Sequence, residues 1–419
     1  MTSSTAMQQH AAAGIPDSVV AMIPHVNVQA FCDDQNTARI MQAVAADRRM
    51  AKAHMDIQLG GIDAAAQVLG SGSTPNVLLV ESTQPRQGII AELEQLAAVC
   101  DPATKVIVIG HVNDVILYRE LIRAGISEYL VAPLHQLQVI EAIGNLFHDS
   151  SANPVGRVAA FVGVKGGVGS STIAHNVAWL ISRQHAIDTV ITDLDLAFGT
   201  AGLNFNLDSA QGIVDALSAP ERVDQVLIDR LLTKCGDRLS LLAAPGSFDR
   251  EVSIEAQALE TVLRVVRGNV PMVVVDVPNV WAPWTRHVLV QADEVVITAT
   301  PEIASLRNAK NFIDLLKTAR PNDRPPRLVL NQMGVVKRPE IPLAEFSKAV
   351  GLEPALVIPY DAQSFGTAAS NGQMLVEIAS KSKAAEAFGK LAQLLVGREP
   401  PAKTSKFPFA PLMKKLRKK

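Results

Sequence analysis

A glycine-rich segment follows the apolar run AAFVGV and precedes the helical pattern IAHNVAWLIS; it reads Lys165-Gly166-Gly167-Val168-Gly169-Ser170-Ser171-Thr172. Glycine permits the turns that let successive backbone N–H groups point at one anion. The start of a helix directly behind such a turn also favours negative charge. The spacing therefore predicts a phosphate-binding loop, in which all eight residues contact a nucleotide and Ser171 offers its hydroxyl to Mg²⁺.

The common phosphate-loop pattern G-x-x-x-x-G-K-[ST] fails here at two positions. Val164 stands where the first glycine belongs, and Ser170 stands where the lysine after Gly169 belongs. Two alternatives remain beside the phosphate loop. One is a glycine-rich turn without a ligand, and the other is a dinucleotide-binding G-x-G-x-x-G turn, which breaks at Thr172.

Carboxylates follow two apolar runs farther along the chain. Asp193 and Asp195 follow Thr189–Thr192, and Asp276 ends the run Met272–Val275. Ligands of α/β sheets bind at the carboxyl ends of the strands, where a buried anion is costly unless a cation compensates it. We therefore expect Mg²⁺ at this edge, with Asp276 behind its direct ligands. Taken singly, each aspartate also fits a helix cap or a turn.

Two series of short apolar runs and helical patterns position these residues, which predicts two α/β domains with parallel sheets. The expected strands of the first are Val26–Phe31, Val77–Val80, Val106–Ile109 and Glu128–Val131. Those of the second include Val158–Val162, Thr189–Thr192, Met272–Val275, Glu294–Thr298 and Leu328–Leu330. We expect five segments: a disordered start (1–15), a first domain (16–148), a linker (149–156), a nucleotide-binding domain (157–398) and a basic tail (399–419).

Bulk composition excludes several classes of protein. The 419 residues carry 39 basic and 41 acidic side chains and are 48% hydrophobic, which argues against general disorder and against a general polyanion binder. Three separated cysteines, Cys32, Cys100 and Cys235, fit a reducing compartment. Without a signal peptide or a long apolar run, the chain is expected in the cytoplasm.

The segment x-K-G-G-x-G-x-[ST]-[ST] resembles the deviant phosphate loop of the ParA/MinD ATPase superfamily. The resemblance implies an ATP·Mg²⁺-dependent homodimer in which Lys165 reaches the nucleotide of the opposite subunit. It also implies that Asp193 lies near Mg²⁺, and Asp195 near the attacking water. Two further roles follow for residues late in the chain: Asn331 of RLVLNQMG reads adenine, and Pro359 and Asp361 of IPYD flank the base.

Several phrases are similar to the CpaE/TadZ type of this superfamily, among them DLDLAFGTAGL and IPYDAQSFGTAASNGQMLVE. Ser170 in place of the usual lysine also fits that type. Because one preorganised charge is then missing, we expect ATP binding with slow or negligible hydrolysis, and leave open whether the chain is an enzyme. An active ParA-like ATPase acting on DNA or on septum positioning, and a scaffold without nucleotide, are the alternatives.

The first domain resembles a response-regulator receiver, a flavodoxin-like α/β domain that CpaE-type proteins carry at this place. A working receiver needs Asp, Ser or Thr, and Lys where this chain has Glu81, Gly110 and Ala132, although Asp33 and Asp34 remain. We therefore expect a recognition module that is not phosphorylated.

The resemblance to the CpaE/TadZ type further implies that the chain helps to localise or scaffold Flp/Tad-type pilus assembly and secretion machinery at a polar landmark. Nucleic acid is not expected as a partner, because the conspicuous basic cluster is confined to the tail. There, seven basic side chains alternate with Phe and Leu, which predicts peripheral contact with the inner membrane or a partner; a solvated end is the alternative.

Overall fold

The protein is described by a computed structural model over residues 23, 26–70, 74–147, 156–207, 211–246 and 253–397. It divides into two compact units, Met1–Pro154 with Lys317–Arg324 and Val155–Leu316 with Pro325–Lys419. The expected start (1–15), the tail (399–419) and the linker except residue 156 lie outside the described residues.

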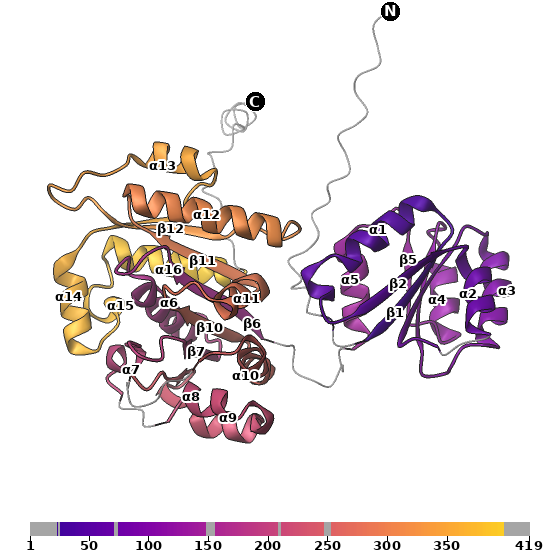
Figure 1. Ribbon diagram of the computed structural model, residues 1–419, viewed down its shortest axis with the longest axis horizontal. Helices are drawn as coiled ribbons and strands as arrows, with labels where there is room; N and C mark the ends of the chain where they lie inside the picture. The colour runs from indigo at the N-terminus through magenta and orange to yellow at the C-terminus, as the bar shows by residue number, and fades with distance from the viewer. Residues whose placement is uncertain are drawn as a thin grey trace, which may run out of the picture. The chain divides into compact units, whose positions relative to one another are not determined.

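The first unit is a five-stranded parallel sheet with strand order β2-β1-β3-β4-β5. This is the flavodoxin-like order of a doubly wound sheet. Its strands are β1 (Asn27–Cys32), β2 (His54–Leu59), β3 (Val77–Ser82), β4 (Lys105–Gly110) and β5 (Glu128–Val131). Its helices are α1 (Gln35–Ala45), α2 (Gly61–Leu69), α3 (Arg86–Ala97), α4 (Val115–Arg123) and α5 (Gln136–Asn145), with a 3-10 turn at Arg48–Met50. Figure 1 shows both sets.

Four of these strands overlap the predicted ones, whereas β2 was missed. Every residue of β3 is buried, as is typical of a central parallel strand covered on both faces. None of the six residues of β2 is buried, because this strand lies at the sheet edge. Its sequence HMDIQL therefore lacks the continuous apolar run that marks the other strands.

The second unit contains an eight-stranded sheet with order β13-β12-β11-β6-β10-β7-β9-β8, in which only the β8–β9 pair is antiparallel. The five strands predicted here are present. All eight are β6 (Arg157–Gly163), β7 (Thr189–Asp193), β8 (Thr233–Gly236), β9 (Leu239–Leu242), β10 (Met272–Val277), β11 (Glu294–Ala299), β12 (Arg327–Met333) and β13 (Leu356–Pro359).

Helices cover both faces of this second sheet and enclose a hydrophobic core on each side (Figure 1). One face packs against α6 (Ser170–Gln184), α7 (Ala201–Asn204), α15 (Leu375–Ile378) and α16 (Lys383–Leu395), with α14 (Ala362–Asn371) adjoining α15. The other packs against α8 (Ile213–Ser218), α9 (Gln225–Leu231), α10 (Ala256–Asn269), α11 (Pro283–Gln291), α12 (Ile303–Ala319) and α13 (Leu343–Val350), with a 3-10 turn at Pro220–Arg222. The central strands are thereby held in register, and their carboxyl ends meet at one edge.

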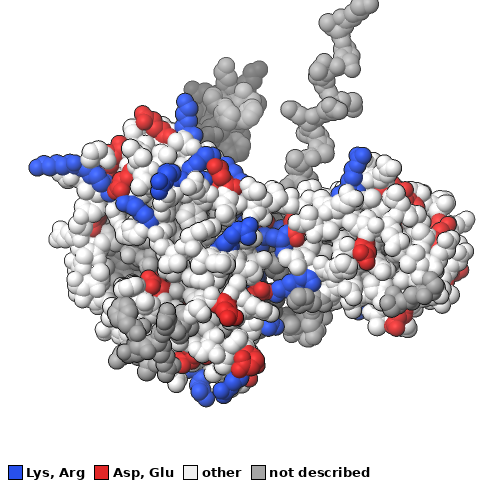
Figure 2. All heavy atoms as spheres, viewed as in Figure 1, with Lys and Arg blue, Asp and Glu red and all other residues white. Residues whose placement is uncertain are grey.

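Surface charge is mixed in sign. On the face drawn in Figure 2, basic and acidic side chains of the described residues lie interspersed. The three cysteines are free thiols, with Cys32 buried and the other two half-buried. Among the described residues, no helix combines the length and the apolar composition needed to span a bilayer.

Candidate functional site

The predicted phosphate loop connects β6 to α6. Two of its glycines, Gly167 (φ 77°) and Gly169 (φ 88°), adopt the left-handed backbone region that only glycine enters without strain. A Cβ atom at Gly169 would also lie 2.6 Å from Nδ2 of Asn331, which is too close for any side chain. These two glycines are therefore required by the geometry of the loop.

The backbone N–H groups from Lys165 to Thr172 form what we call the amide cradle. Within the described part of the chain, none of these eight consecutive N–H groups donates a hydrogen bond. The N–H before them, on Val164, donates to the Thr298 carbonyl at 3.0 Å, and the one after them, on Ile173, donates to Gly169 at 3.1 Å. Unpaired amides at the start of a fifteen-residue helix form a receptor for an anion such as phosphate.

Ser170 occupies the position of the missing lysine. Its Oγ atom is buried and has no hydrogen-bond partner among the described residues. A buried hydroxyl without a partner is costly, so a ligand oxygen in the cradle would satisfy it. Ser171 and Thr172, both half-buried, occupy the first turn of α6. The cradle and these hydroxyls fit the phosphates of a nucleotide.

Asp193 and Asp276 end up side by side. Asp193 ends β7, Asp276 lies in β10, and the two are direct partners in the register of these strands. Both are buried. Burial, together with the negative charge of Asp276, raises the pKa of Asp193 to about 6. A cation between the phosphate loop and this pair would remove that electrostatic cost.

The residues fit Mg²⁺ better than a metal that needs a full protein cage. In the described ranges there is no cluster of three or more His, Cys, Asp and Glu residues arranged to hold a metal ion. Mg²⁺ is usually held by one or two carboxylates together with phosphate oxygens and water. Asp193, Asp276 and the Ser171 hydroxyl match that pattern of ligands.

His175 belongs to the same group of side chains and was not predicted. It lies in α6, fully buried, with Nε2 at 3.3 Å from Oδ2 of Asp276 and Nδ1 at 2.9 Å from Nδ2 of Asn204. Because an amide nitrogen can only donate, Nδ1 accepts from Asn204 and Nε2 carries the ring proton, without a hydrogen-bond partner among the described residues. The sequence did offer one signal for this residue, namely a histidine on the apolar face of the predicted helix that follows the loop.

Asp195 has the geometry of a turn residue. Its Oδ1 atom accepts a hydrogen bond from the Phe198 N–H at 3.1 Å, and its own N–H donates to Asp193 at 3.0 Å. The side chain is half-buried beside the buried pair. The turn role expected as the alternative is thus present, and a contact of Asp195 with the attacking water stays a prediction.

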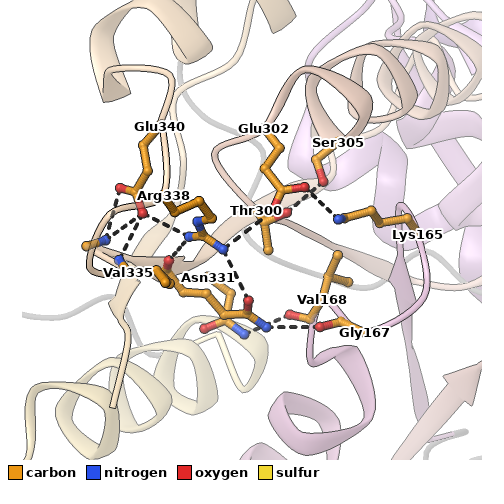
Figure 3. Close-up of polar contacts among 12 residues, drawn as sticks. Lys165, Gly167, Val168, Thr300, Glu302, Ser305, Asn331, Val335, Arg338 and Glu340 are labelled. Atoms are coloured by element: carbon orange, nitrogen blue, oxygen red, sulfur yellow. Dashed lines mark hydrogen bonds and ion pairs between the residues drawn. The ribbon is translucent and has the colours of Figure 1, made fainter. Parts of the chain in front are cut away.

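Lys165 is held within its own subunit in this structure. Its Nζ atom lies 2.6 Å from Oε2 of Glu302, which directly precedes α12. The Nη1 atom of Arg338 lies 3.4 Å from the other oxygen of the same carboxylate. Figure 3 shows this arrangement, in which Glu302 lies between the two cations. The reach of Lys165 into an opposite subunit stays a prediction.

Asn331 lies at the phosphate loop. It is buried in β12, and its Nδ2 atom donates to the carbonyl of Val168 at 2.8 Å (Figure 3). The recognition of adenine by this residue stays a prediction. Pro359, the last residue of β13, pairs with Met333 of β12. Asp361 caps α14, and its hydrogen bonds with Ser364 lower the pKa of its carboxyl. Their contact with a base likewise stays a prediction.

A second cluster of polar residues lies in the first unit around Glu81, which is fully buried in β3. Its Oε2 atom accepts hydrogen bonds from the backbone N–H groups of Asp33 (2.8 Å) and Asp34 (3.0 Å). Its Oε1 atom lies 2.7 Å from Oγ1 of Thr37 and 3.0 Å from Nε2 of His111. Four donors thus hold this carboxylate.

Comparison with known proteins finds a family model that matches most of the first part of the second unit, and several relatives of the chain. Residues 156–326 match the family model AAA_31, which describes an AAA domain. The septum site-determining protein MinD of Helicobacter pylori is 22% identical over 246 residues, which cover 56% of this chain and 88% of that protein.

Solved structures are similar to parts of this chain. A ParA family ATPase from Chlorobium tepidum is 26% identical and covers 57% of this chain and 99% of its own (TM-score 0.51). MinD from Pyrococcus horikoshii, complexed with Mg-ADP, is 20% identical and covers 59% and 99% (TM-score 0.51). Pilus assembly protein CpaE from Caulobacter crescentus is 45% identical and covers 31% and 98% (TM-score 0.30).

Proposed function

Because the second unit matches the AAA_31 model and the chain is similar to ParA and MinD ATPases, we propose that it is a nucleotide-operated dimerising switch of the ParA/MinD superfamily. In this proposal it binds ATP with Mg²⁺ and hydrolyses it slowly or not at all. The observation that carries the proposal is the amide cradle, eight unpaired N–H groups in a row behind a glycine turn. A switch of this kind works because the ligand binds one state, the dimer, better than the other.

The cradle supplies binding through groups that do not depend on the missing lysine. Backbone N–H groups from Lys165 to Thr172 hold the phosphates, and the Ser170 hydroxyl gains the partner that it lacks. Asp193 and Asp276, with Ser171, hold the metal site, while His175 faces Asp276 at 3.3 Å. Bound Mg²⁺ would offset the negative charge of the phosphates and of the two carboxylates.

Slow hydrolysis follows from the residue at position 170. A serine cannot place a positive charge against the phosphates, and removal of one preorganised electrostatic contact commonly lowers a rate by a factor of about 100 to 1000. Lys165 remains as a cation, but it is paired with Glu302 at 2.6 Å. The chain is accordingly a latch whose lifetime is set by nucleotide exchange and dimer dissociation.

The first unit acts in this proposal as a receiver-like recognition module without phosphorylation. The strand order is flavodoxin-like, and the position of the phosphorylated aspartate is occupied by Glu81. Since the Glu81 carboxylate is fully buried and already accepts from four donors, it is not available as a nucleophile. Burial and the Glu81 charge also raise the pKa of Asp33.

The finer assignment is to the localisation or scaffolding of Flp/Tad-type pilus assembly and secretion machinery. Its support is sequence resemblance: the phrases similar to CpaE/TadZ proteins and the 45% identity with the Caulobacter crescentus chain. Polar placement, partners in the secretion machinery and contact of the basic tail with the inner membrane belong to the same proposal.

The proposal is tested by titration of the purified full chain with fluorescently labelled ATP, with and without Mg²⁺, followed by sedimentation. Saturable Mg²⁺-dependent binding that converts monomer to dimer supports it. Failure of the wild-type chain to bind ATP would reduce the protein to an adaptor without a nucleotide switch. Turnover of about 1 per second or more, typical of an ordinary enzyme, would contradict the latch.

A further inference from the structure

Four carboxamide side chains donate hydrogen bonds to backbone carbonyls of the phosphate loop and of the two residues just before it. The pairs are Asn279 Nδ2 with Gly163 O (2.8 Å), Asn308 Nδ2 with Val164 O (2.9 Å), Gln332 Nε2 with Gly167 O (2.9 Å) and Asn331 Nδ2 with Val168 O (2.8 Å). Figure 3 shows the contacts made at Gly167 and Val168.

These donors come from three separate elements that surround the loop. Asn279 follows β10, Asn308 lies in α12, and Asn331 and Gln332 lie in β12. The direction of the Asn308 amide is fixed on both sides, because its oxygen accepts from Arg307 at 3.1 and 3.2 Å. A carbonyl can only accept, so the NH₂ group must face the loop.

Each of these hydrogen bonds fixes the orientation of one peptide plane. The C=O of one residue and the N–H of the next share a rigid plane and point in opposite directions. A bond to the Val164 carbonyl therefore aims the Lys165 N–H away from Asn308. In the same way, the bonds from Gln332 and Asn331 aim the N–H groups of the residues after Gly167 and Val168, namely Val168 and Gly169.

The fourth bond differs in its consequence. Asn279 holds the Gly163 carbonyl, whose peptide plane contains the N–H of Val164. That N–H donates to the Thr298 carbonyl at 3.0 Å and does not belong to the cradle. The chain thus provides a bond of the same kind, at the residue directly before Val164, that orients no ligand-binding group.

The backbone of Gln332 carries a further sign of constraint. Its φ of 56° lies in the left-handed region, which is unfavourable for a residue with a side chain. Such a conformation persists only where surrounding contacts impose it. Here it accompanies the bond from Gln332 to the loop.

We propose that Asn308 and Gln332 are positioning residues. They turn N–H groups of the amide cradle toward the phosphate before it binds, and thereby raise the affinity of the loop for phosphate. The inference rests on the proposed nucleotide binding. Preset donors need no reorganisation when phosphate arrives, which favours affinity for the triphosphate part and leaves the affinity for adenosine unchanged.

The test compares alanine variants of the full chain by competition against labelled ATP, with sodium tripolyphosphate and adenosine as separate competitors. Asn308→Ala and Gln332→Ala should each weaken tripolyphosphate binding by about tenfold and leave adenosine binding unchanged. Asn279→Ala is the matched control, because it removes an equivalent bond outside the cradle. Asn311→Ala, one turn along α12 at an exposed position, is the second control.

Thermal unfolding of each variant shows whether it is folded, which excludes misfolding as the cause of weaker binding. Because Asn308 and Gln332 lie in different elements, one folded variant is enough for the test if the other does not fold. The inference is overturned if both folded variants bind tripolyphosphate like the wild type, or if Asn279→Ala weakens it equally. Equal loss of adenosine and tripolyphosphate binding also overturns it. If the wild-type chain binds no ATP, the proposed function itself fails, which is a distinguishable result.

Discussion

The Nζ atom of Lys165 lies 2.6 Å from Oε2 of Glu302, and this ion pair occupies the one loop lysine that the proposed dimer needs. Each side chain is about one-third exposed. An exposed pair of this kind is worth little, on the order of 1 kcal/mol or less. The pair is therefore a weak restraint on Lys165, which the proposed dimerisation would have to break.

Glu302→Gln should accordingly promote the ATP-dependent dimer. Without the carboxylate, Lys165 no longer has to leave an ion pair, so the dimer dissociation constant should fall by up to about fivefold. Analytical ultracentrifugation with ATP and Mg²⁺ measures it. Asp314→Asn, which breaks the exposed Lys310–Asp314 pair on the neighbouring helix, is the control and should change nothing. A weaker dimer in Glu302→Gln would show that the carboxylate assists assembly instead.

Ser170→Lys should turn the latch toward an enzyme. A lysine after Gly169 would place a positive charge against the phosphates, and we expect steady-state ATP turnover to rise by about 100-fold. Ser170→Met has a side chain of similar length without charge and should stay at the wild-type rate. Equal turnover in the two variants would show that the missing charge does not limit hydrolysis.

Stability without Mg²⁺ should depend on pH through Asp193. Its pKa is raised from 3.8 to about 6, so the folded state binds this proton more tightly than the unfolded state. The penalty for ionising Asp193 is absent below about pH 4 and grows as the pH rises through about 6, which lowers the free energy of unfolding. Between pH 4 and 7.5 the free energy of unfolding of the wild type should fall by about 2 kcal/mol relative to that of Asp193→Asn.

Urea unfolding of both proteins at the two pH values measures this difference. Addition of Mg²⁺ and ATP should reduce it, since the cation offsets the charge of the Asp193–Asp276 pair. A wild type whose stability changes with pH in parallel with Asp193→Asn would show that this carboxyl is not strained in the folded chain.

Glu81→Gln should destabilise the first unit. The amide keeps the shape of the side chain but replaces one acceptor oxygen with a donor, which leaves buried donors such as Thr37 without a partner. We expect the free energy of unfolding to fall by about 2 to 3 kcal/mol. Glu120→Gln, which breaks the exposed ion pair with Arg86, should cost less than about 1 kcal/mol. If urea unfolding gives similar losses of free energy of unfolding for Glu81→Gln and Glu120→Gln, the hydrogen bonds of Glu81 do not stabilise the first unit more than an exposed ion pair does.

Much of the fold was predictable because its signals are local. The central strands are continuous apolar runs, and β10 is buried along its whole length. Edge strands such as β2 carry no such run, since half of their contacts are with solvent or with parts of the chain that the local sequence does not specify. The order of the strands was likewise not contained in any single run.

The conformation of the predicted phosphate loop follows from local sequence. Glycines at 167 and 169 permit the left-handed turns, and the helix behind them follows from its own pattern, so the amide cradle needs few residues from elsewhere. The aspartates at strand ends were also predictable, because parallel strands bring their carboxyl ends to one edge of the sheet.

Only the tertiary structure decided which side chains surround these groups. Glu302 is 137 positions from Lys165, and the four carboxamides reach the loop from three elements. Such contacts depend on strand order, register and helix packing, which are properties of the whole fold. A local sequence pattern specifies the backbone of the loop; the assembled sheet determines its charge environment and the direction of its amides.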